Sequence, residues 1–174
     1  MTESAVTAFV GDSLTEQGDW QSVLPGRHVL NLGVGGNTSA DLLDRLDEIV
    51  AAGPSTVVLE IGTNDFAWRL PVEEVVANIE HVLTELRAKL PEARILVQSI
   101  LPRQREYAHI VTGVNDEVAA FAPRVGAEYV DVWPVLADDE GGLRPEFTVD
   151  GLHLTPAGYD AWYALLRTVL GVGD

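Results

Sequence analysis

Short apolar runs recur along the chain and alternate with segments of helical periodicity. The runs are rich in Val, Ile and Leu, as expected of parallel strands that are covered on both faces. They span Ala5–Val10, His28–Leu32, Thr56–Ile61, Arg94–Ile100 and Glu128–Val132. We therefore expect five strands in a mostly parallel sheet.

Between these runs, apolar residues return every three or four positions, which is typical of a helix with one face on a core. The stripes cover Leu42–Val50, Val72–Leu90 and Val114–Val125. Pro71 suits the first turn of the second helix. The last helix is expected to begin after a Thr155 cap, with Pro156 as its first residue, and to end near Leu170.

This alternation predicts an α/β fold with helices on both faces of the sheet and right-handed crossovers. The 174 residues are enough for one domain with a substantial core, so we expect a single domain over residues 1–174. The sequence contains no internal repeat, low-complexity segment or linker.

The composition narrows the classes of protein. A hydrophobic content of 47% and a mean hydropathy of +0.11 indicate a globular chain. Eleven basic and 27 acidic residues give a formal charge of -16, which disfavours nucleic acid and anionic membranes as partners. Cysteine is absent, which excludes disulfides, thiolate metal sites and a cysteine nucleophile.

No segment of the sequence resembles a signal peptide, and no apolar run approaches the roughly 20 residues of a transmembrane helix. We therefore expect a cytoplasmic protein without membrane insertion, although prior removal of a leader would leave the same sequence. The sequence leaves the oligomeric state open, and a homo-oligomer is compatible with it.

Polar loops follow the first three strands. They are Gly11–Ser13, Asn31–Thr38 and Gly62–Asp65. In a doubly wound sheet of order 2-1-3-4-5, these loops meet at the carboxyl edge, where such sheets bind ligands. Asp150 and His153 follow the fifth strand and precede the last helix, so we expect them at the same edge.

These residues have the chemistry that acyl transfer needs. The Ser13 hydroxyl is a poor nucleophile until a base such as His153 takes its proton. Asp150 would hold the imidazole in the right tautomer and stabilise its cation. The backbone N–H of Gly36, the amide of Asn64 and the N–H of Ser13 would stabilise the oxyanion.

Four sequence blocks carry a specific resemblance when taken together and in order. They are Gly-Asp-Ser-Leu at 11–14, Asn-Leu-Gly-Val-Gly-Gly-Asn-Thr at 31–38, Gly-Thr-Asn-Asp at 62–65 and Asp-Gly-Leu-His at 150–153. The chain thereby resembles the GDSL esterases and lipases of the SGNH hydrolase superfamily. The resemblance implies a flavodoxin-like three-layer α/β/α sandwich, with a five-stranded parallel sheet of order 2-1-3-4-5. It also implies Ser13 as nucleophile, His153 as base, Asp150 as its partner, and Gly36 and Asn64 as oxyanion donors.

The second block departs slightly from this family. Many relatives have Asp at the position of Asn37 and often Arg at that of Leu32, but neither position is assigned to catalysis. The Gly-x-Ser-x-Gly motif of α/β-hydrolases is absent, and Ser13 lies near the N-terminus, before any expected helix.

Single residues also have alternative interpretations. Ser13 alone is more often a turn or helix-capping residue. Asp12 and Asp65 are expected to order their loops as hydrogen-bond acceptors; a serine mechanism needs no metal, and we expect none and no cofactor. Glu60 interrupts an apolar strand and needs a partner that the sequence does not identify.

Trp68, Arg69 and Arg103 are candidates for substrate binding, with ordinary packing as the alternative for each.

The sequence thus predicts a serine hydrolase that cleaves carboxylic esters, with short-chain acyl or acetyl esters as small-molecule substrates. The same machinery could serve a thioesterase or a carbohydrate O-acetylesterase. A flavodoxin-like binding module without catalysis is the alternative from another class. Its glycine-rich loop would hold a phosphate or flavin, but the loop lacks the lysine of a P-loop and the spacing of a dinucleotide fingerprint.

Overall fold

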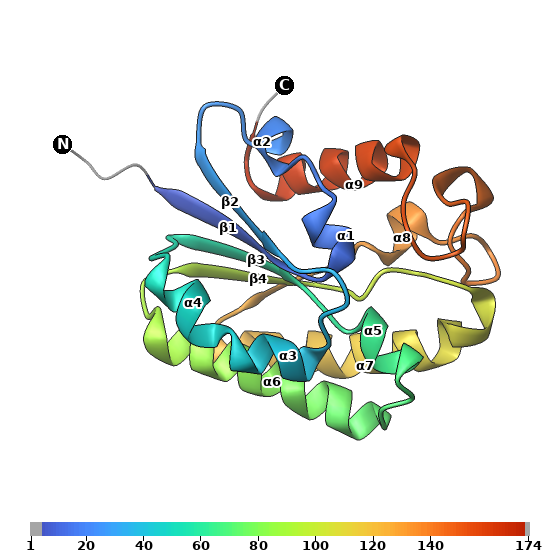
Figure 1. Ribbon diagram of the computed structural model, residues 1–174, viewed down its shortest axis with the longest axis horizontal. Helices are drawn as coiled ribbons and strands as arrows, with labels where there is room; N and C mark the ends of the chain where they lie inside the picture. Colours follow the sequence, from blue (N-terminus) through green and yellow to red (C-terminus); the bar gives the residue numbers. More distant parts are fainter. Residues whose placement is uncertain (1–4, 173–174) are drawn as a thin grey trace.

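A five-stranded parallel sheet forms the centre of the computed structural model, which describes residues 5–172 (Figure 1). The strands are β1 (Val6–Gly11), β2 (His28–Gly33), β3 (Thr56–Glu60), β4 (Arg94–Gln98) and β5 (Glu128–Val130). Their order is β2-β1-β3-β4-β5, and every neighbouring pair is parallel. This arrangement confirms the predicted α/β fold and strand order.

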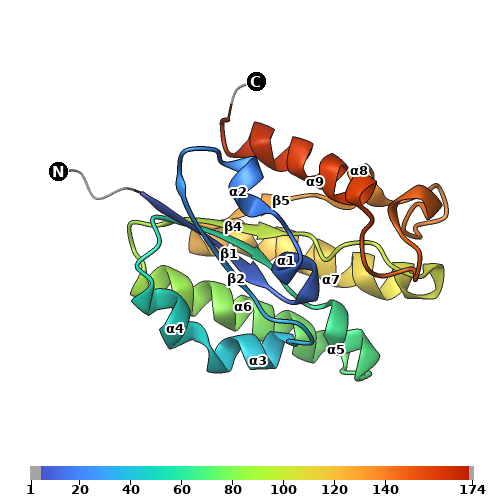
Figure 2. The same ribbon diagram turned by 45° about the horizontal axis from the view of Figure 1, so that its top comes forward.

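Helices cover both faces of the sheet, as Figures 1 and 2 show. One face carries α1 (Ser13–Glu16), α2 (Trp20–Val23), α8 (Trp133–Leu136) and α9 (Pro156–Val169). The other carries α3 (Ser39–Asp44), α4 (Leu46–Ala51), α5 (Thr63–Ala67), α6 (Val72–Lys89) and α7 (Ala108–Phe121). Three short 3₁₀ turns complete the chain at Arg105–Tyr107, Ala122–Val125 and Pro145–Phe147.

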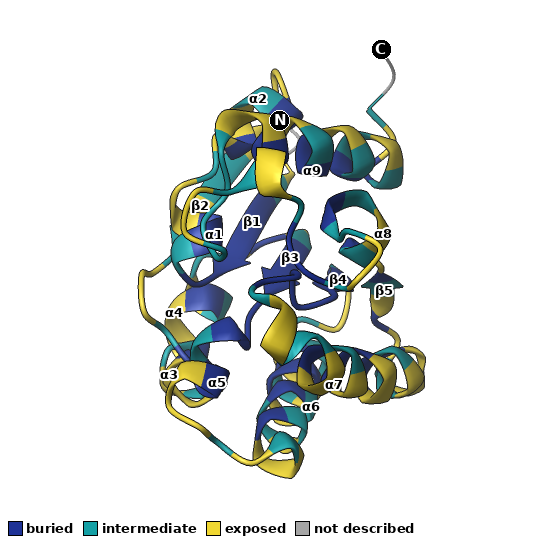
Figure 3. Cartoon of the chain, turned by 90° about the vertical axis from the view of Figure 1, so that its right-hand side faces the viewer, coloured by how far each residue is buried: buried dark blue, intermediate teal, exposed yellow. Residues whose placement is uncertain are grey.

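Each strand shares its side chains between two cores because successive residues point to opposite faces. On β1, Ala8 and Val10 enter the core under α3, α4, α6 and α7, whereas Phe9 enters the core under α2 and α9. Figure 3 shows the result, with β1, β3 and β4 mostly coloured as buried and the helices exposed on their outer sides, whereas the edge strand β2 is more exposed. Within residues 5–172, no helix is both long enough and apolar enough to cross a lipid bilayer.

Aromatic side chains join the last helix to the segment after β1. Trp20 stacks on Phe9 with ring centroids 4.4 Å apart and meets Trp162 of α9 edge to face at 5.0 Å. The Tyr159 hydroxyl donates to the Leu14 carbonyl at 2.8 Å, and the Tyr163 hydroxyl accepts from the Asp19 N–H at 2.6 Å. These contacts fix α9 against α1 and α2.

Three strands end earlier than the sequence predicts: β3 ends at Glu60, one residue early, and β4 and β5 each end two residues early. β4 ends at Gln98 and β5 at Val130, because side chains take over the hydrogen bonds of the ladder. The Ser99 hydroxyl accepts from the Val132 N–H, and the Asn115 amide bonds both the N–H and the carbonyl of Ile100.

The helix predictions need three corrections. The stripe Leu42–Val50 is not one helix but is split into α3 and α4 at Arg45. The Arg45 guanidinium donates to the Asn37 side chain and to the Leu32 carbonyl. Pro71 lies at the N-cap of α6, one position before the first turn. The third stripe ends in a 3₁₀ turn that contains Pro123, which has no N–H for an α-helical bond.

The last helix is confirmed. The Thr155 hydroxyl caps α9 by accepting from the Gly158 N–H, and Pro156 is the first helical residue.

Candidate active site

Ser13 is separated from the end of β1 only by Asp12 and is the first residue of α1, not a loop residue before any helix as the sequence suggested. Asp12 is the N-cap of this short helix, and its Oδ1 accepts the Leu14 N–H at 2.9 Å. The cap holds the backbone on both sides of Ser13, so the strand end and the helix start together fix the serine.

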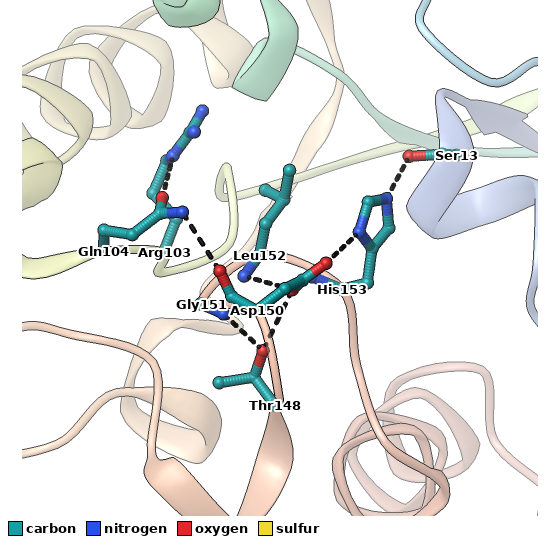
Figure 4. A network of polar contacts seen from close by, with 8 residues as sticks. All are labelled: Ser13, Arg103, Gln104, Thr148, Asp150, Gly151, Leu152 and His153. Carbon is teal, nitrogen blue, oxygen red and sulfur yellow. Dashed lines mark hydrogen bonds and ion pairs between the residues drawn. The ribbon is translucent and has the colours of Figure 1, made fainter.

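The side chains of Ser13, His153 and Asp150 form one hydrogen-bonded chain (Figure 4). Ser13 Oγ lies 3.2 Å from His153 Nε2, and His153 Nδ1 lies 2.7 Å from Asp150 Oδ2. With the proton on Nδ1, the ring donates to Asp150 and accepts from the serine hydroxyl. This is the relative placement that a base-activated serine requires.

The loop before α9 holds Asp150 in a fixed orientation. Its Oδ1 accepts the N–H groups of Leu152 at 2.9 Å and His153 at 2.8 Å, which leaves Oδ2 for the His153 ring. Burial alone would raise the pKa of Asp150, but the His153 ring and the two backbone N–H groups outweigh it and hold the pKa well below its usual range. Asp150 therefore stays a carboxylate at neutral pH.

The glycine-rich loop turns sharply after β2. The Asn37 N–H donates to the Val34 carbonyl at 3.1 Å, and Gly36 has a φ of +81°, a conformation that side-chain-bearing residues rarely adopt. Gly36 is exposed, and nothing lies within 4 Å of where a Cβ would stand. The loop leaves the space around Gly36 open.

Asn64 lies in the first turn of α5 and reaches the glycine-rich loop. Its Nδ2 donates to the Asn37 carbonyl at 2.9 Å. A side-chain amide carries two N–H groups, so this bond orients the amide and leaves a second N–H for another acceptor. Asn64 thus links its own loop to the loop that contains Gly36.

Asp65 orders the same edge from beneath, as the sequence predicts. Its carboxylate accepts the Ser39 N–H at 3.0 Å and the Ser39 hydroxyl, which ties α5 to the start of α3. Burial raises the pKa of Asp65, and these bonds from Ser39 oppose the rise.

Asp12 and Glu60 form an unusual pair of buried carboxyl groups beneath Ser13. Gly11, next to Asp12, pairs with Glu60 in the sheet register. Both side chains are fully buried, and Asp12 Oδ2 and both Glu60 oxygens have no hydrogen-bond partner among residues 5–172. Within the described residues, the hydrogen-bond partner that the sequence leads us to expect for Glu60 is therefore missing, and the nearby charge of Asp12 has the same sign.

Burial raises the pKa of Asp12 to about 7, although the Leu14 N–H acts in the opposite direction. Burial also raises the pKa of Glu60 well above its usual range, and the charge of Asp12 raises it further. Two carboxylates in a dry interior are costly to ionise together, so burial and the charge of Asp12 both favour the protonated form of Glu60.

The candidate substrate residues lie in different environments. Trp68 is 74% exposed and lies four positions after Asn64, and Arg69 follows with a φ of +58°. Arg103 is only 6% exposed, and its Nη1 donates to the carbonyl and hydroxyl of Thr63. Trp68 and Arg69 face solvent near the site, whereas the Arg103 guanidinium is bound by the protein itself.

Two residues near the site carry no sequence signal. Gln104 donates to the Asp150 carbonyl at 3.3 Å, and the Thr148 hydroxyl accepts the Gly151 N–H at 2.9 Å. Neither belongs to one of the four sequence blocks. Only the proximity of two loops distant in sequence identifies Gln104.

The fold and this edge of the sheet define a carboxylic ester hydrolase, and the comparisons with known proteins agree. The sequence matches the GDSL-like Lipase/Acylhydrolase family over residues 9–161, so the chain belongs to this family. This assignment speaks against the alternative of a binding module without catalysis.

Individual relatives are similar over most of their length. Platelet-activating factor acetylhydrolase IB subunit alpha1 of Bos taurus is 29% identical over 172 residues, covering 93% of this chain and 73% of the relative. A solved structure from Streptococcus pneumonia, named for platelet activating factor, is 29% identical with a TM-score of 0.86, covering 97% of this chain and 85% of that chain. An acetylxylan esterase from Geobacillus stearothermophilus, solved as a catalytic mutant, shares the fold at 21% identity with a TM-score of 0.81, covering 99% and 98% of the two chains.

Proposed function

We propose that this protein hydrolyses carboxylic esters through an acyl-enzyme on Ser13, with His153 as general base and Asp150 as the group that orients it. The observation that carries the proposal is the chain of contacts of 3.2 Å and 2.7 Å from Ser13 Oγ through His153 to Asp150. The family to which the chain belongs supports ester hydrolysis as the reaction.

The first half of the reaction forms the acyl-enzyme. Ser13 Oγ attacks the ester carbonyl while His153 Nε2 takes its proton, and the ionised Asp150 stabilises the imidazolium that results. The oxyanion is stabilised by the N–H groups of Ser13 and Gly36 and by the free N–H of Asn64. His153 then gives the proton to the departing alcohol.

The second half releases the acid. Water enters the position that the alcohol left, His153 takes its proton, and the resulting hydroxide attacks the acyl carbon on Ser13. Collapse of the second tetrahedral intermediate breaks the bond to Ser13 Oγ, which recovers its proton from His153. The proposed cycle thus returns the enzyme to its starting state with only the residues named above.

The proposed substrates are small esters with short acyl or acetyl groups. The names of two similar proteins, an acetylhydrolase and an acetylxylan esterase, support an acetyl group as the part that is transferred. Trp68 and Arg69 are proposed to contact the substrate from the solvent side, because both are exposed and follow Asn64 on α5 or just after it. Arg103 is not proposed to touch substrate, since its guanidinium is buried.

A substrate panel distinguishes the esters from the alternatives on the same machinery. p-Nitrophenyl acetate, butyrate and octanoate test the acyl length, acetyl-CoA tests a thioester, and acetylated xylan tests a carbohydrate ester. Higher kcat/KM for acetate than for octanoate supports the proposal. A clear preference for acetyl-CoA over every oxygen ester would replace it with a thioesterase.

The mechanism is tested by Ser13→Ala. We expect kcat on p-nitrophenyl acetate to fall by at least about 10⁴-fold, because no other group on this edge supplies the nucleophile. The variant should also lose labelling by a fluorophosphonate probe. Turnover close to wild type from a folded Ser13→Ala protein would contradict the proposal.

A further inference from the structure

We propose that Arg103 and Gln104 are positioning residues that hold the loop of Asp150 and His153 in register with the helix that carries Asn64. The inference rests on the function proposed above. It assigns to Arg103 a role through other residues, in place of contact with substrate.

A continuous set of hydrogen bonds crosses from one side of the site to the other. Arg103 Nη1 donates to the Thr63 carbonyl at 2.8 Å, immediately before Asn64 in α5. Arg103 Nε donates to Gln104 Oε1 at 3.0 Å, and Gln104 Nε2 donates to the Asp150 carbonyl at 3.3 Å. Figure 4 shows the part of this path from Arg103 to His153.

The burial of Arg103 favours a rigid structural role for its side chain over contact with a ligand. Its guanidinium lies 4.1 Å from the centroid of the Tyr107 ring, a distance suited to a cation–π contact. Within residues 5–172, no carboxylate forms an ion pair with it. A buried cation without a counter-ion must be compensated by hydrogen bonds and by the ring, which restricts it to one orientation.

The backbone and packing reinforce the same connection. The Arg103 carbonyl accepts the Leu143 N–H at 2.9 Å, so the segment that leads to Asp150 is attached at both of its ends. Gly151 has a φ of +79°, and a Cβ there would stand 2.9 Å from Gln104 Cγ. Gln104 therefore packs directly on the backbone between Asp150 and His153.

Catalysis depends on this connection because the loop of Asp150 and His153 and the proposed oxyanion donors belong to different elements. A displacement of about 1 Å of catalytic groups can cost about 100-fold in rate. Loss of the connection should move His153 relative to the oxyanion donors without removing any group that binds substrate. The expected signature is a lower kcat with an unchanged KM.

The test compares Arg103→Met and Gln104→Met with Arg87→Met as a matched control. Arg87 also donates to several backbone carbonyls, among them those of Val125 and Gly126, but it joins α6 to the turn before β5. The endpoint of fluorophosphonate labelling counts the functional sites, and kcat is calculated per labelled site. A merely structural role would lower the number of sites and leave kcat per site unchanged.

We expect each of the two test variants to lose about tenfold to 100-fold in kcat per labelled site, with KM within about twofold of wild type. The rate of labelling should fall in parallel. The Arg87→Met protein should lose stability but keep its kcat per site. Because both residues act through one path, the double variant should lose little more than the larger single loss.

Two results would overturn the inference. One is kcat per site within about twofold of wild type for Gln104→Met, a substitution that the fold should tolerate because Gln104 is only half-buried. The other is equal losses in the Arg87→Met control. Failure of the proposed function is a separate result, since it is read from Ser13→Ala, and wild-type turnover in that variant removes the mechanism itself.

Discussion

Asn64 connects the two segments that carry the proposed oxyanion donors. One N–H of its amide donates to the Asn37 carbonyl, next to Gly36, and the other remains for the substrate. In the proposed mechanism, the side chain therefore contributes one oxyanion donor directly and positions the loop that carries a second one. Its removal should affect the transition state more than the bound substrate.

For Asn64→Ala we expect kcat to fall by about 100- to 1,000-fold with little change in KM, the size typical for one oxyanion donor. Asn64→Asp should lose at least as much, because a carboxylate would face both the Asn37 carbonyl and the developing oxyanion. Steady-state kinetics on p-nitrophenyl acetate measures both. An alanine variant within threefold of wild type would show that Asn64 is not a donor.

The buried carboxyl pair beneath Ser13 links proton binding to stability. The folded state raises the pKa of Asp12 from 3.8 to about 7, so it binds more protons than the unfolded state between these values. Stability contributed by protonated Asp12 is complete below about pH 4 and is lost as the pH rises through 7.

Asp12→Asn should remove this dependence. One proton corresponds to a slope of at most about 1.4 kcal/mol per pH unit. We expect the unfolding free energy of the variant, relative to wild type, to rise between pH 4.5 and 7 and then level off. Urea denaturation across this range measures the difference, and two parallel curves would contradict the raised pKa of Asp12. The side-chain amide oxygen that Asp12→Asn introduces can still accept the Leu14 N–H, so the helix cap is preserved.

At the residue scale, the sequence predicts well that His153 lies beside Ser13 and that Asp150 lies beside His153. His153, Asp150 and Asn64 are polar residues placed just after strands or just before a helix, so strand order alone brings them to one edge. Arg103 shows the limit of this reasoning. Its position in a loop after β4 suggests substrate contact, but the direction of a long side chain depends on packing against Tyr107 and Thr63.

At the scale of elements, the N-terminus of α3 is well capped and lies directly after the glycine-rich loop. The Thr38 hydroxyl accepts the Asp41 N–H, and the Asp41 carboxylate accepts the Thr38 N–H at 2.8 Å, which is a capping box. The next residue, Ser39, binds Asp65. The helix start thus anchors one end of the loop that presents Gly36.

Thr38→Ala should lower the free energy of unfolding by about 1 kcal/mol, because the Asp41 N–H loses its acceptor. Thr38→Ser is the matched control, since it keeps the hydroxyl and should stay close to wild type. Denaturant titration with an unchanged slope checks both. Equal stability of the alanine and serine variants would show that the cap contributes nothing.

The short elements were the hardest to predict. α1, α2, α5 and α8 are each four or five residues long, too short for an apolar stripe to repeat. The long stripes of α6 and α9 were predicted nearly to their ends. Leu42–Val50 reads as one helix because its apolar spacing continues across Arg45, whereas the break depends on the bonds of Arg45 to a distant loop.

At the scale of the whole molecule, the alternating pattern predicts a parallel sheet with helices on both faces, and the resemblance to the GDSL family adds the strand order. The sheet then determines the site, since all the polar loops lie at the carboxyl ends of parallel strands. The strand lengths of β4 and β5 were not predictable, because they depend on Ser99 and Asn115, whose partners are remote in sequence. Local pattern predicts the elements, and tertiary hydrogen bonds decide where they end.

The contact of α9 with α1 and α2 has a consequence for how activity arises. Ser13 and His153 are 140 positions apart, and Tyr159 reaches Leu14 across 145 positions. In the proposed mechanism, Ser13 is therefore synthesised long before its base, and it stays unactivated until the C-terminal part of the chain packs against α1. We therefore expect ester turnover to report completed folding of the chain from β1 to α9, and a fragment that ends before α9 to lack it.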